Sequence, residues 1–167
     1  MIDVKIKKLT DTATLPTYGS SEAACFDLYA DCKDAKYRYT LDTDQGYITV
    51  EHNGIKIAPH TTVKVGTGLA MQTVSYRRGY VGLIYARSGL ATKQGLRPSN
   101  CVGVVDSDYT GEIIVALHND TDEDKIIHHG DRIAQMMWMP FEQCHFVEVD
   151  ELNETERGDG GFGHTGV

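Results

Sequence analysis

Three short segments of this chain carry residue types that suit phosphate and base chemistry. Asn100–Glu112 reads NCVGVVDSDYTGE, in which two short apolar runs flank an acidic turn with an aromatic residue. Ala86–Leu96 places an Arg-Ser pair before a short helical pattern, and Arg157–Gly166 is a glycine-rich tail with a cation and a ring. A carboxylate beside an aromatic wall, an anion-binding pair and a mobile arm together suit a polyphosphate attached to a flat base.

The acidic turn allows two interpretations. Asp106 follows the apolar pair Val104-Val105, and acidic residues at turns are usually turn formers because Asp bonds its own backbone. Glu112 could equally be a surface residue. Tyr109 favours a functional interpretation, since it offers a flat wall at the mouth of an expected hairpin. We therefore expect backbone groups here that read the edge of a base.

The Arg-Ser pair stands where an apolar run, 80–85, gives way to a helical pattern over Ser88–Gln94, which Gly95 is placed to end. Guanidinium and hydroxyl donors at the start of a helix favour anions. A Ser88 that merely caps the helix is the alternative. The sequence contains neither a P-loop nor a glycine-rich dinucleotide fingerprint, which excludes those two kinds of phosphate site.

Composition limits the partners. The chain has 167 residues and a net charge of −8, from 24 acidic and 16 basic side chains. This balance argues against binding a nucleic-acid backbone, which needs a basic face, but not against a small anion held by a few arginines. We expect a single domain without nucleic acid as partner.

Nothing in the sequence predicts a membrane span or an exported protein. No run of about 18 apolar residues is present, and the N-terminus lacks an apolar leader segment. The four cysteines are scattered without a C-x-x-C pair, so we expect reduced thiols and a cytoplasmic protein. The adjacent His128-His129 and Arg77-Arg78 pairs are expected to be solvated.

Alternating apolar residues dominate the elements that must position these groups. The runs are short and bounded by Gly, Asn, Asp or Pro, which is typical of an all-β sandwich or barrel. They cover 4–9, 46–50, 55–57, 62–65, 80–84, 113–117 and 133–139. Asn53-Gly54 predicts a tight turn, so residues 37–58 are expected to form hairpins. The tail from Asn153 onward is too rich in glycine to bury a core and is expected to be mobile when free.

Five segments along nearly the whole chain resemble the motifs of the trimeric dUTP pyrophosphatase (dUTPase) family, in the same order. They are Ala23–Leu28 (AACFDL), Arg87–Ala91 (RSGLA), Asn100–Glu112, Gly130–Gln135 (GDRIAQ) and Arg157–Gly166. The resemblance implies an all-β jelly-roll or β-clip fold with one short helix, assembled as a homotrimer with three shared active sites. The β core would span 1–152, with 31–58 as an extended hairpin insertion and 153–167 as a flexible active-site arm.

The same resemblance implies an activity, the hydrolysis of dUTP to dUMP and pyrophosphate with Mg²⁺. Asp106 would be the base that activates the water attacking the α-phosphorus. The phosphates would contact Arg87, Ser88, Gly89 and Gln135. The uracil would be framed by Asn100, Gly103, Val104 and Val105, with Tyr109 packed on the deoxyribose.

The tail and the metal complete the set of implied contacts. Arg157 and Thr165 would reach the γ-phosphate, and Phe162 would stack on the uracil, with Gly163 in the same contact set. Asp27 would meet Mg²⁺ only through water.

Three features depart from the family pattern. Cys25 replaces a glycine usual in the first motif, and His164 stands where the tail usually has Ser. Residues 31–58 are longer than compact members need.

Two alternatives to this activity are open. A dCTP deaminase-like protein would share the fold and the trimer, but would not carry the Val-Val-Asp-Ser-Asp-Tyr segment. A regulatory protein could instead use nucleotide-bound and free states of the tail to bind a protein partner. Only the insertion at 31–58 favours that possibility, and no particular partner is indicated.

Overall fold

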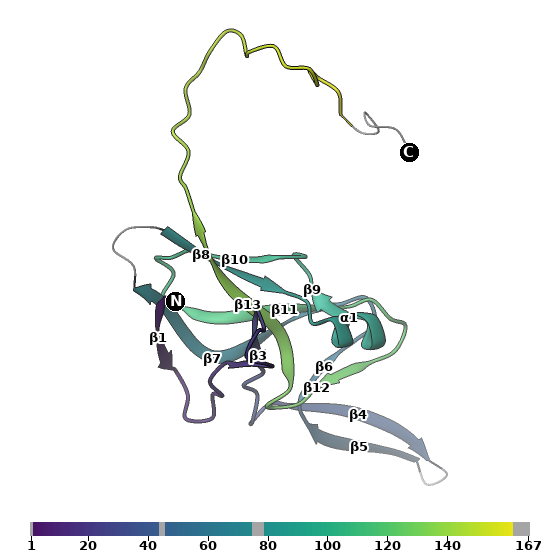
Figure 1. Ribbon diagram of the computed structural model, residues 1–167. Helices are drawn as coiled ribbons and strands as arrows, with labels where there is room; N and C mark the ends of the chain where they lie inside the picture. Colours follow the sequence, from purple (N-terminus) through teal and green to yellow (C-terminus); the bar gives the residue numbers. More distant parts are fainter. Residues whose placement is uncertain (1, 44–45, 75–78, 162–167) are drawn as a thin grey trace.

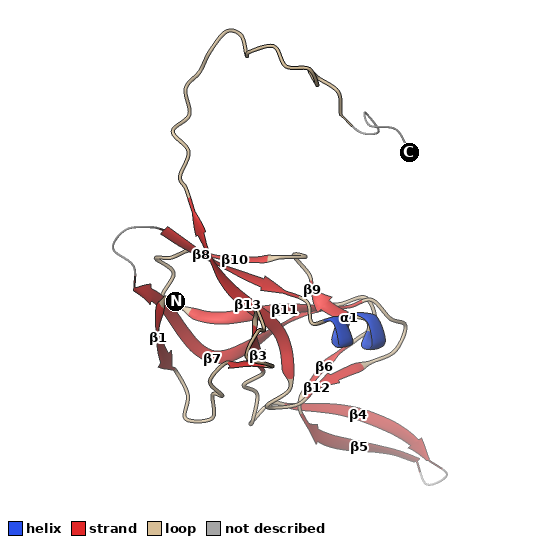
Figure 2. Cartoon of the chain, in the orientation of Figure 1, coloured by secondary structure: helices blue, strands red, loops and turns tan. Residues whose placement is uncertain are grey.

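The structure is a computed structural model that describes residues 2–43, 46–74 and 79–161, and it is built mainly of β-strands (Figures 1 and 2). The strands are β1 (Asp3–Lys8), β2 (Thr17–Tyr18), β3 (Phe26–Tyr29), β4 (Lys36–Thr43), β5 (Gly46–Asn53), β6 (Ile55–Ile57), β7 (Thr62–Val74), β8 (Gly79–Tyr85), β9 (Leu96–Pro98), β10 (Gly103–Val105), β11 (Glu112–Asn119), β12 (Lys125–Ile127) and β13 (Arg132–Phe141). One short helix, α1 (Ser88–Gln94), is present in the described part. The expected all-β fold with one short helix is confirmed.

Two antiparallel sheets enclose a single core. One has the strand order β1-β7-β11-β9 and the other β10-β8-β13-β3-β2. Period-two alternation turns Ile113, Val115 and Leu117 of β11 into this core, where they meet Leu28 and Met136 of the other sheet. Because the sheets share this core, loops that cross between them are held at both ends.

Strand β7 is much longer than the apolar run that predicted it, and it carries an irregularity. Its pairing with β11 shifts so that Glu112 lies opposite Ala70 and Ile114 opposite Gly66. Gly68, at the centre of the shift, has a φ of 64°, a left-handed conformation that favours glycine. Beside it, the Thr67 hydroxyl donates to the carbonyl of Ile113 at 2.7 Å.

The hairpin expected within Asn100–Glu112 does not exist. β10 pairs with β8, whereas β11 pairs with β7 and β9, so the two runs belong to different sheets. Residues 106–111 therefore form a loop that crosses between the sheets. Alternation identified both strands but contains no information about which neighbour each one pairs with.

The prediction that Asn53-Gly54 forms the turn of a hairpin is also wrong. β4 and β5 do pair, from Lys36–Asn53 at the base to Thr43–Gly46 at the tip. Gly54 (φ 124°) instead leads the chain out of this hairpin into β6, which pairs with β12. An added Cβ at Gly54 would lie 2.8 Å from the carbonyl oxygen of Ile127, so this close approach requires glycine. The β4–β5 hairpin projects from the body (Figure 1).

The chain leaves the body after β13. Within residues 142–161 there is no helix or strand, and this segment extends away from the sheets (Figures 1 and 2). No helix among the described residues has the length and apolar character needed to cross a membrane.

Candidate active site

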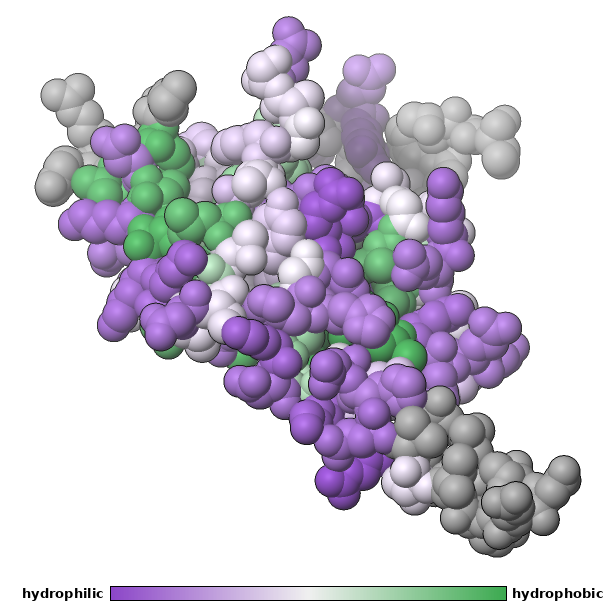
Figure 3. Space-filling model, turned by 90° about the horizontal axis from the view of Figure 1, so that it is seen from below, coloured by the Kyte–Doolittle hydropathy of each residue, from purple (hydrophilic) through white to green (hydrophobic). Residues whose placement is uncertain are grey.

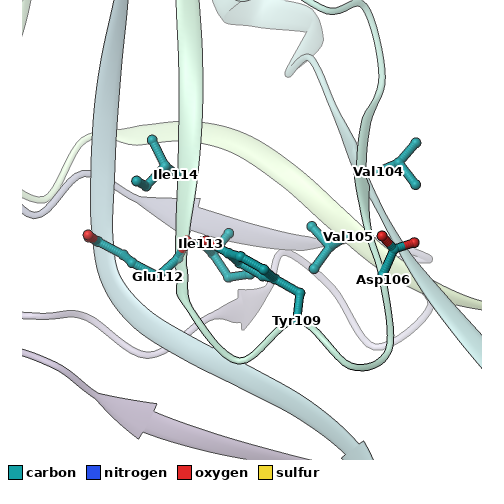
Figure 4. A pocket seen from close by; sticks show the side chains of 7 residues that line it. All are labelled: Val104, Val105, Asp106, Tyr109, Glu112, Ile113 and Ile114. Atoms are coloured by element: carbon teal, nitrogen blue, oxygen red, sulfur yellow. Dashed lines mark hydrogen bonds between the residues drawn. The ribbon is translucent and has the colours of Figure 1, made fainter.

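The loop between β10 and β11 borders a hollow of about 220 Å³, which we call the Asp106 hollow (Figure 4). It is lined by Val104, Val105, Asp106, Tyr109, Glu112, Ile113 and Ile114. Asp106 is exposed, and no other described residue donates a hydrogen bond to its carboxylate. Its backbone carbonyl, in contrast, closes the turn by accepting the N–H of Tyr109 at 3.1 Å. The carboxylate is thus free to meet a water or a ligand, although the residue also forms the turn.

Tyr109 is fixed as a wall of this hollow. Its hydroxyl donates to the carbonyl of Glu112 at 2.9 Å, and 45% of the residue is exposed. An added Cβ at Gly111 would lie 2.6 Å from the tyrosine oxygen, so the ring packs directly on the backbone there. The sequence allowed Glu112 to be a simple surface residue. Its carboxylate instead accepts the N–H of Gly68 at 2.8 Å.

A second group of polar side chains, the arginine cluster, consists of Asp27, Arg87, Arg132 and Gln135. Neighbouring strands β3, β13 and β8 bring its members together. Arg87 donates to Asp27 at 2.8 Å and Arg132 donates to the other oxygen at 3.2 Å. Gln135 donates to the carbonyl of Ala86 at 2.9 Å and so holds the segment just before Arg87. The two arginines also line a polar hollow of about 220 Å³ beside α1.

At the start of α1 the side chain of Ser88 makes no hydrogen bond with the described residues, although its carbonyl accepts the hydroxyl of Thr92 at 2.7 Å. The N-cap residue is Arg87, in an extended conformation and without a side-chain capping bond, so Ser88 does not cap the helix. Ser88 and Gly89 are exposed, and an added Cβ at Gly89 would meet nothing within 4 Å. Gly95 ends the helix with a φ of 67°, as expected, and donates to carbonyls of the last turn.

Asp106 and the arginine cluster lie apart in one chain. β10 runs antiparallel to β8, with Gly103 opposite Ile84 and Val105 opposite Gly82. Arg87 follows one end of β8, while Asp106 lies near Gly82. At about 3.3 Å per residue, the chain from Gly82 to Arg87 spans roughly 16 Å. The two hollows accordingly share no lining residue.

The remaining expected site residues fall into three places. Asn100 is exposed beside β10, with its Nδ2 3.6 Å from where a Cβ of Gly103 would stand. Arg157 lies on the extended C-terminal segment, where it donates to the carbonyl of Gly160 at 2.8 Å. Phe162, Gly163 and Thr165 lie outside the described residues, as do His164 and Arg77-Arg78.

Sequence reasoning missed two members of these groups. Arg132 lies within the fourth motif, but its pairing with Asp27 depends on the register of β13 against β3. The role of Glu112 depends on the irregularity of β7. Both roles depend on tertiary contacts that the sequence does not reveal. For Glu112, only Gly66 and Gly68 in the sequence indicated a close approach of another group.

Comparison with known proteins identifies the family. A family model described as dUTPase matches residues 44–166. The chain belongs to the dUTPase family. It is 38% identical over 165 residues to a deoxyuridine 5'-triphosphate nucleotidohydrolase of Syntrophotalea carbinolica, covering 99% of this chain and 97% of that protein. A protein with the same description from Desulfitobacterium hafniense is 43% identical over 153 residues, or 92% and 87% of the two chains.

Solved dUTPase structures share the fold. That of Staphylococcus bacteriophage 80alpha, with dUpNHpp, has a TM-score of 0.77 at 22% identity and covers 99% of each chain. A mutant dUTPase of phage phi11 of S. aureus, described with a structural Mg(II) ion, has a TM-score of 0.70 at 17% identity, over 91% and 99%. At these identities the likeness shows the fold alone.

Proposed function

We propose that this chain is a dUTP diphosphatase, which hydrolyses dUTP to dUMP and pyrophosphate. The observation that carries the proposal is the exposed, unbonded Asp106 carboxylate beside the Tyr109 wall, in a chain that belongs to the dUTPase family. The nucleotidohydrolases of bacteria that share about two fifths of its residues support the same substrate. Such an activity supplies dUMP and limits uracil in DNA.

Asp106 supplies the base in this mechanism. Its carboxylate takes a proton from a water whose oxygen forms a bond to the α-phosphorus. The bond between that phosphorus and the oxygen bridging to the β-phosphorus breaks, and the leaving pyrophosphate carries the electron pair. The protein contributes mainly position and electrostatics, as in other phosphoryl transfers.

Substrate recognition uses the other expected residues. The backbone around Asn100, Gly103, Val104 and Val105 frames the uracil, and Tyr109 packs on the deoxyribose where a 2′-hydroxyl would clash. Arg87, Ser88 and Gly89 hold phosphate oxygens, and Gln135 supports them through Ala86. Arg157, Phe162, Gly163 and Thr165 close over the nucleotide from the tail.

Magnesium fits this arrangement as a partner of the phosphates. No group of three or more His, Cys, Asp or Glu side chains in the described part of the chain can hold a metal. Asp27 is 12% exposed and both of its oxygens accept from arginines, so it would reach the ion through water. When bound, Mg²⁺ neutralises charge on the leaving pyrophosphate. The phosphate oxygens would supply most of its ligands.

We further propose a homotrimer in which each site combines parts of different chains. The arginine cluster and the Asp106 hollow lie apart in one chain, and the segment carrying Arg157 leads away from both (Figure 1). Phe146 is 90% exposed and Leu152 is 88% exposed, as expected of a segment that packs on another subunit. Ile6, Leu9 and Leu15 are exposed as well, and apolar atoms gather on one side of the surface that is seen from below (Figure 3).

The test is a phosphate-release assay across the deoxynucleoside triphosphates, coupled to inorganic pyrophosphatase. We expect dUTP to be hydrolysed in preference to dCTP, dTTP and UTP. Because the coupling pyrophosphatase itself needs Mg²⁺, the dependence of dUTP hydrolysis on Mg²⁺ is measured by direct chromatography of dUMP. Turnover of dCTP with release of ammonia, and none of dUTP, would contradict the proposal.

A further inference from the structure

Tyr109 is held in place by Glu112, a residue that has no role in the mechanism above. Tyr109 is bonded at two points: its N–H donates to Asp106, and its hydroxyl donates to the carbonyl of Glu112. The ring therefore spans the loop from the proposed base to the first residue of β11. Its orientation depends on where the carbonyl of Glu112 is held.

The side chain of Glu112 is anchored in the irregularity of β7. Its Oε1 accepts the N–H of Gly68 at 2.8 Å, and an added Cβ at Gly66 would lie 2.4 Å from that same oxygen. The shift in pairing between β7 and β11 is centred on this contact. Gly66 therefore provides the space for the carboxylate, and Gly68 provides the N–H that it accepts.

The anchor is itself tied to its surroundings. The carbonyl of Gly68 accepts the N–H of Leu9 at 2.7 Å, and the carbonyl of Gly66 accepts the N–H of Asp31 at 2.9 Å. The backbone of β7 that supports Glu112 is thus fixed by two hydrogen bonds, and the carboxylate transmits this rigidity to the start of β11.

We propose that Glu112 is a positioning residue for the wall that selects deoxyribose over ribose. The inference rests on the proposed function, because it requires Tyr109 to pack on the deoxyribose. A ring held by an anchored carbonyl excludes a 2′-hydroxyl by its position. Release of the anchor lets the ring move, so UTP is accepted better relative to dUTP.

The experiment measures kcat/KM for dUTP and for UTP in purified variants, together with their melting temperatures. Glu112→Ala removes the anchor, and Tyr109→Phe removes the hydroxyl that depends on it while keeping the ring. Each should lower the dUTP-to-UTP ratio of kcat/KM by about three- to tenfold, the worth of one hydrogen bond. Glu112→Gln keeps an oxygen that can accept from Gly68 and should retain most of the ratio.

Thr62→Val is the matched control. It removes the hydrogen bond of 3.0 Å between Thr62 and His118, at the other end of the same β7–β11 pair. Its ratio should equal that of the unmodified protein even if its melting temperature falls.

If the Glu112→Ala protein has the same dUTP-to-UTP ratio of kcat/KM as the unmodified protein, the inference is overturned. If Glu112→Ala does not fold, an unchanged ratio in Tyr109→Phe overturns it. If the unmodified protein does not hydrolyse dUTP at all, the proposed function fails instead, which is a distinguishable result.

Discussion

Asp106 combines two tasks at the scale of a single residue. Its carbonyl closes the turn, while its carboxylate has no donor among the described residues and faces solvent. Because the turn uses only the backbone, the side chain can be changed without disturbing the loop. This separation allows catalysis and folding to be tested independently.

Asp106→Asn should keep the fold and the binding of dUTP but lower kcat by roughly 10²–10⁴, the usual contribution of a positioned base. The amide has nearly the same shape and cannot take the proton from the water. Steady-state assays, with binding of a non-hydrolysable dUTP analogue measured by calorimetry, give both quantities. Turnover near the unmodified rate would show that Asp106 is not the base.

Asp31 is a second carboxylate with a structural role. Its oxygens accept from the hydroxyls of Thr10 and Thr12, and His129 lies 3.4 Å away, so His129 is not simply solvated as expected. Burial alone raises the pKa of Asp31, but the two hydroxyls and the charges of His129 and Lys8 outweigh it. The net pKa therefore lies below the ordinary value of 3.8.

A lowered pKa makes the contribution of Asp31 to stability dependent on pH. The stabilisation is fully present above the unfolded value of 3.8 and is lost as the pH falls through the lower folded value. Asp31→Asn should therefore lower the melting temperature at neutral pH, with a difference that shrinks in acid. Thermal melts of both proteins between about pH 7 and about pH 2 measure this difference. A constant difference across that range would contradict the assignment.

Among the elements, the β4–β5 hairpin is the most separable. It pairs with no other strand in the described part of the chain, and its base brings Lys36 opposite Asn53. Its ion pairs, from Lys36 and Arg38 to Glu51, are internal to it. Among the hairpin residues whose side chains are described, none belongs to the hydrophobic core.

Replacement of residues 37–52 by Asn-Gly should leave the protein folded and active. A two-residue turn joins strand positions that already face each other, so Lys36 and Asn53 need not move. We expect a dUTP kcat/KM within about twofold of the unmodified value, since no expected contact lies in the excised part. Loss of activity in a folded variant would instead assign the hairpin to the site.

The elements also show what the sequence could and could not predict. Alternation located most strands, and Gly95 correctly predicted the end of α1. Strand pairing could not be predicted from alternation. The sequence predicted that β10 pairs with β11, and that the Asn53-Gly54 turn joins β5 and β6 in a hairpin, but these strands pair with other partners. β7 was cut short at Val65 because Gly66 and Gly68 interrupt the apolar pattern, although these glycines hold the side chain of Glu112.

For the whole molecule, the distribution of the site residues is the main observation. The resemblance to the dUTPase family implies the members of the site, and one chain places Asp106, Arg87 and Arg157 in three separate regions. Such a division has a simple explanation if copies of the chain complete one another around a closed ring. A shared site predicts that two inactive variants can rescue each other, which a site within one chain does not allow.

Two inactive variants should restore activity when they share a trimer. One carries Asp106→Asn with its tail intact, and the other lacks residues 154–167 but keeps Asp106. Each should be inactive alone, and the deletion should leave the core folded, because residues 154–161 lie outside the core and the whole tail is rich in glycine. After the two are mixed in equal amounts, denatured and refolded together, subunits combine at random.

Across all the randomly reassembled trimers, unmixed ones included, a site finds an intact Asp106 with a chance of about one half and an intact tail from a different chain with a chance of about one half, so about a quarter of the sites should be whole. Native mass spectrometry of the refolded sample confirms that mixed trimers have formed. The control is the same two proteins mixed without denaturation, which should stay inactive while subunits do not exchange. If confirmed mixed trimers are as inactive as the separate variants, the tail does not cross between subunits. In that case Asp106 and Arg157 must meet within one chain, through a movement of the segment 142–161 back toward its own β10–β11 loop.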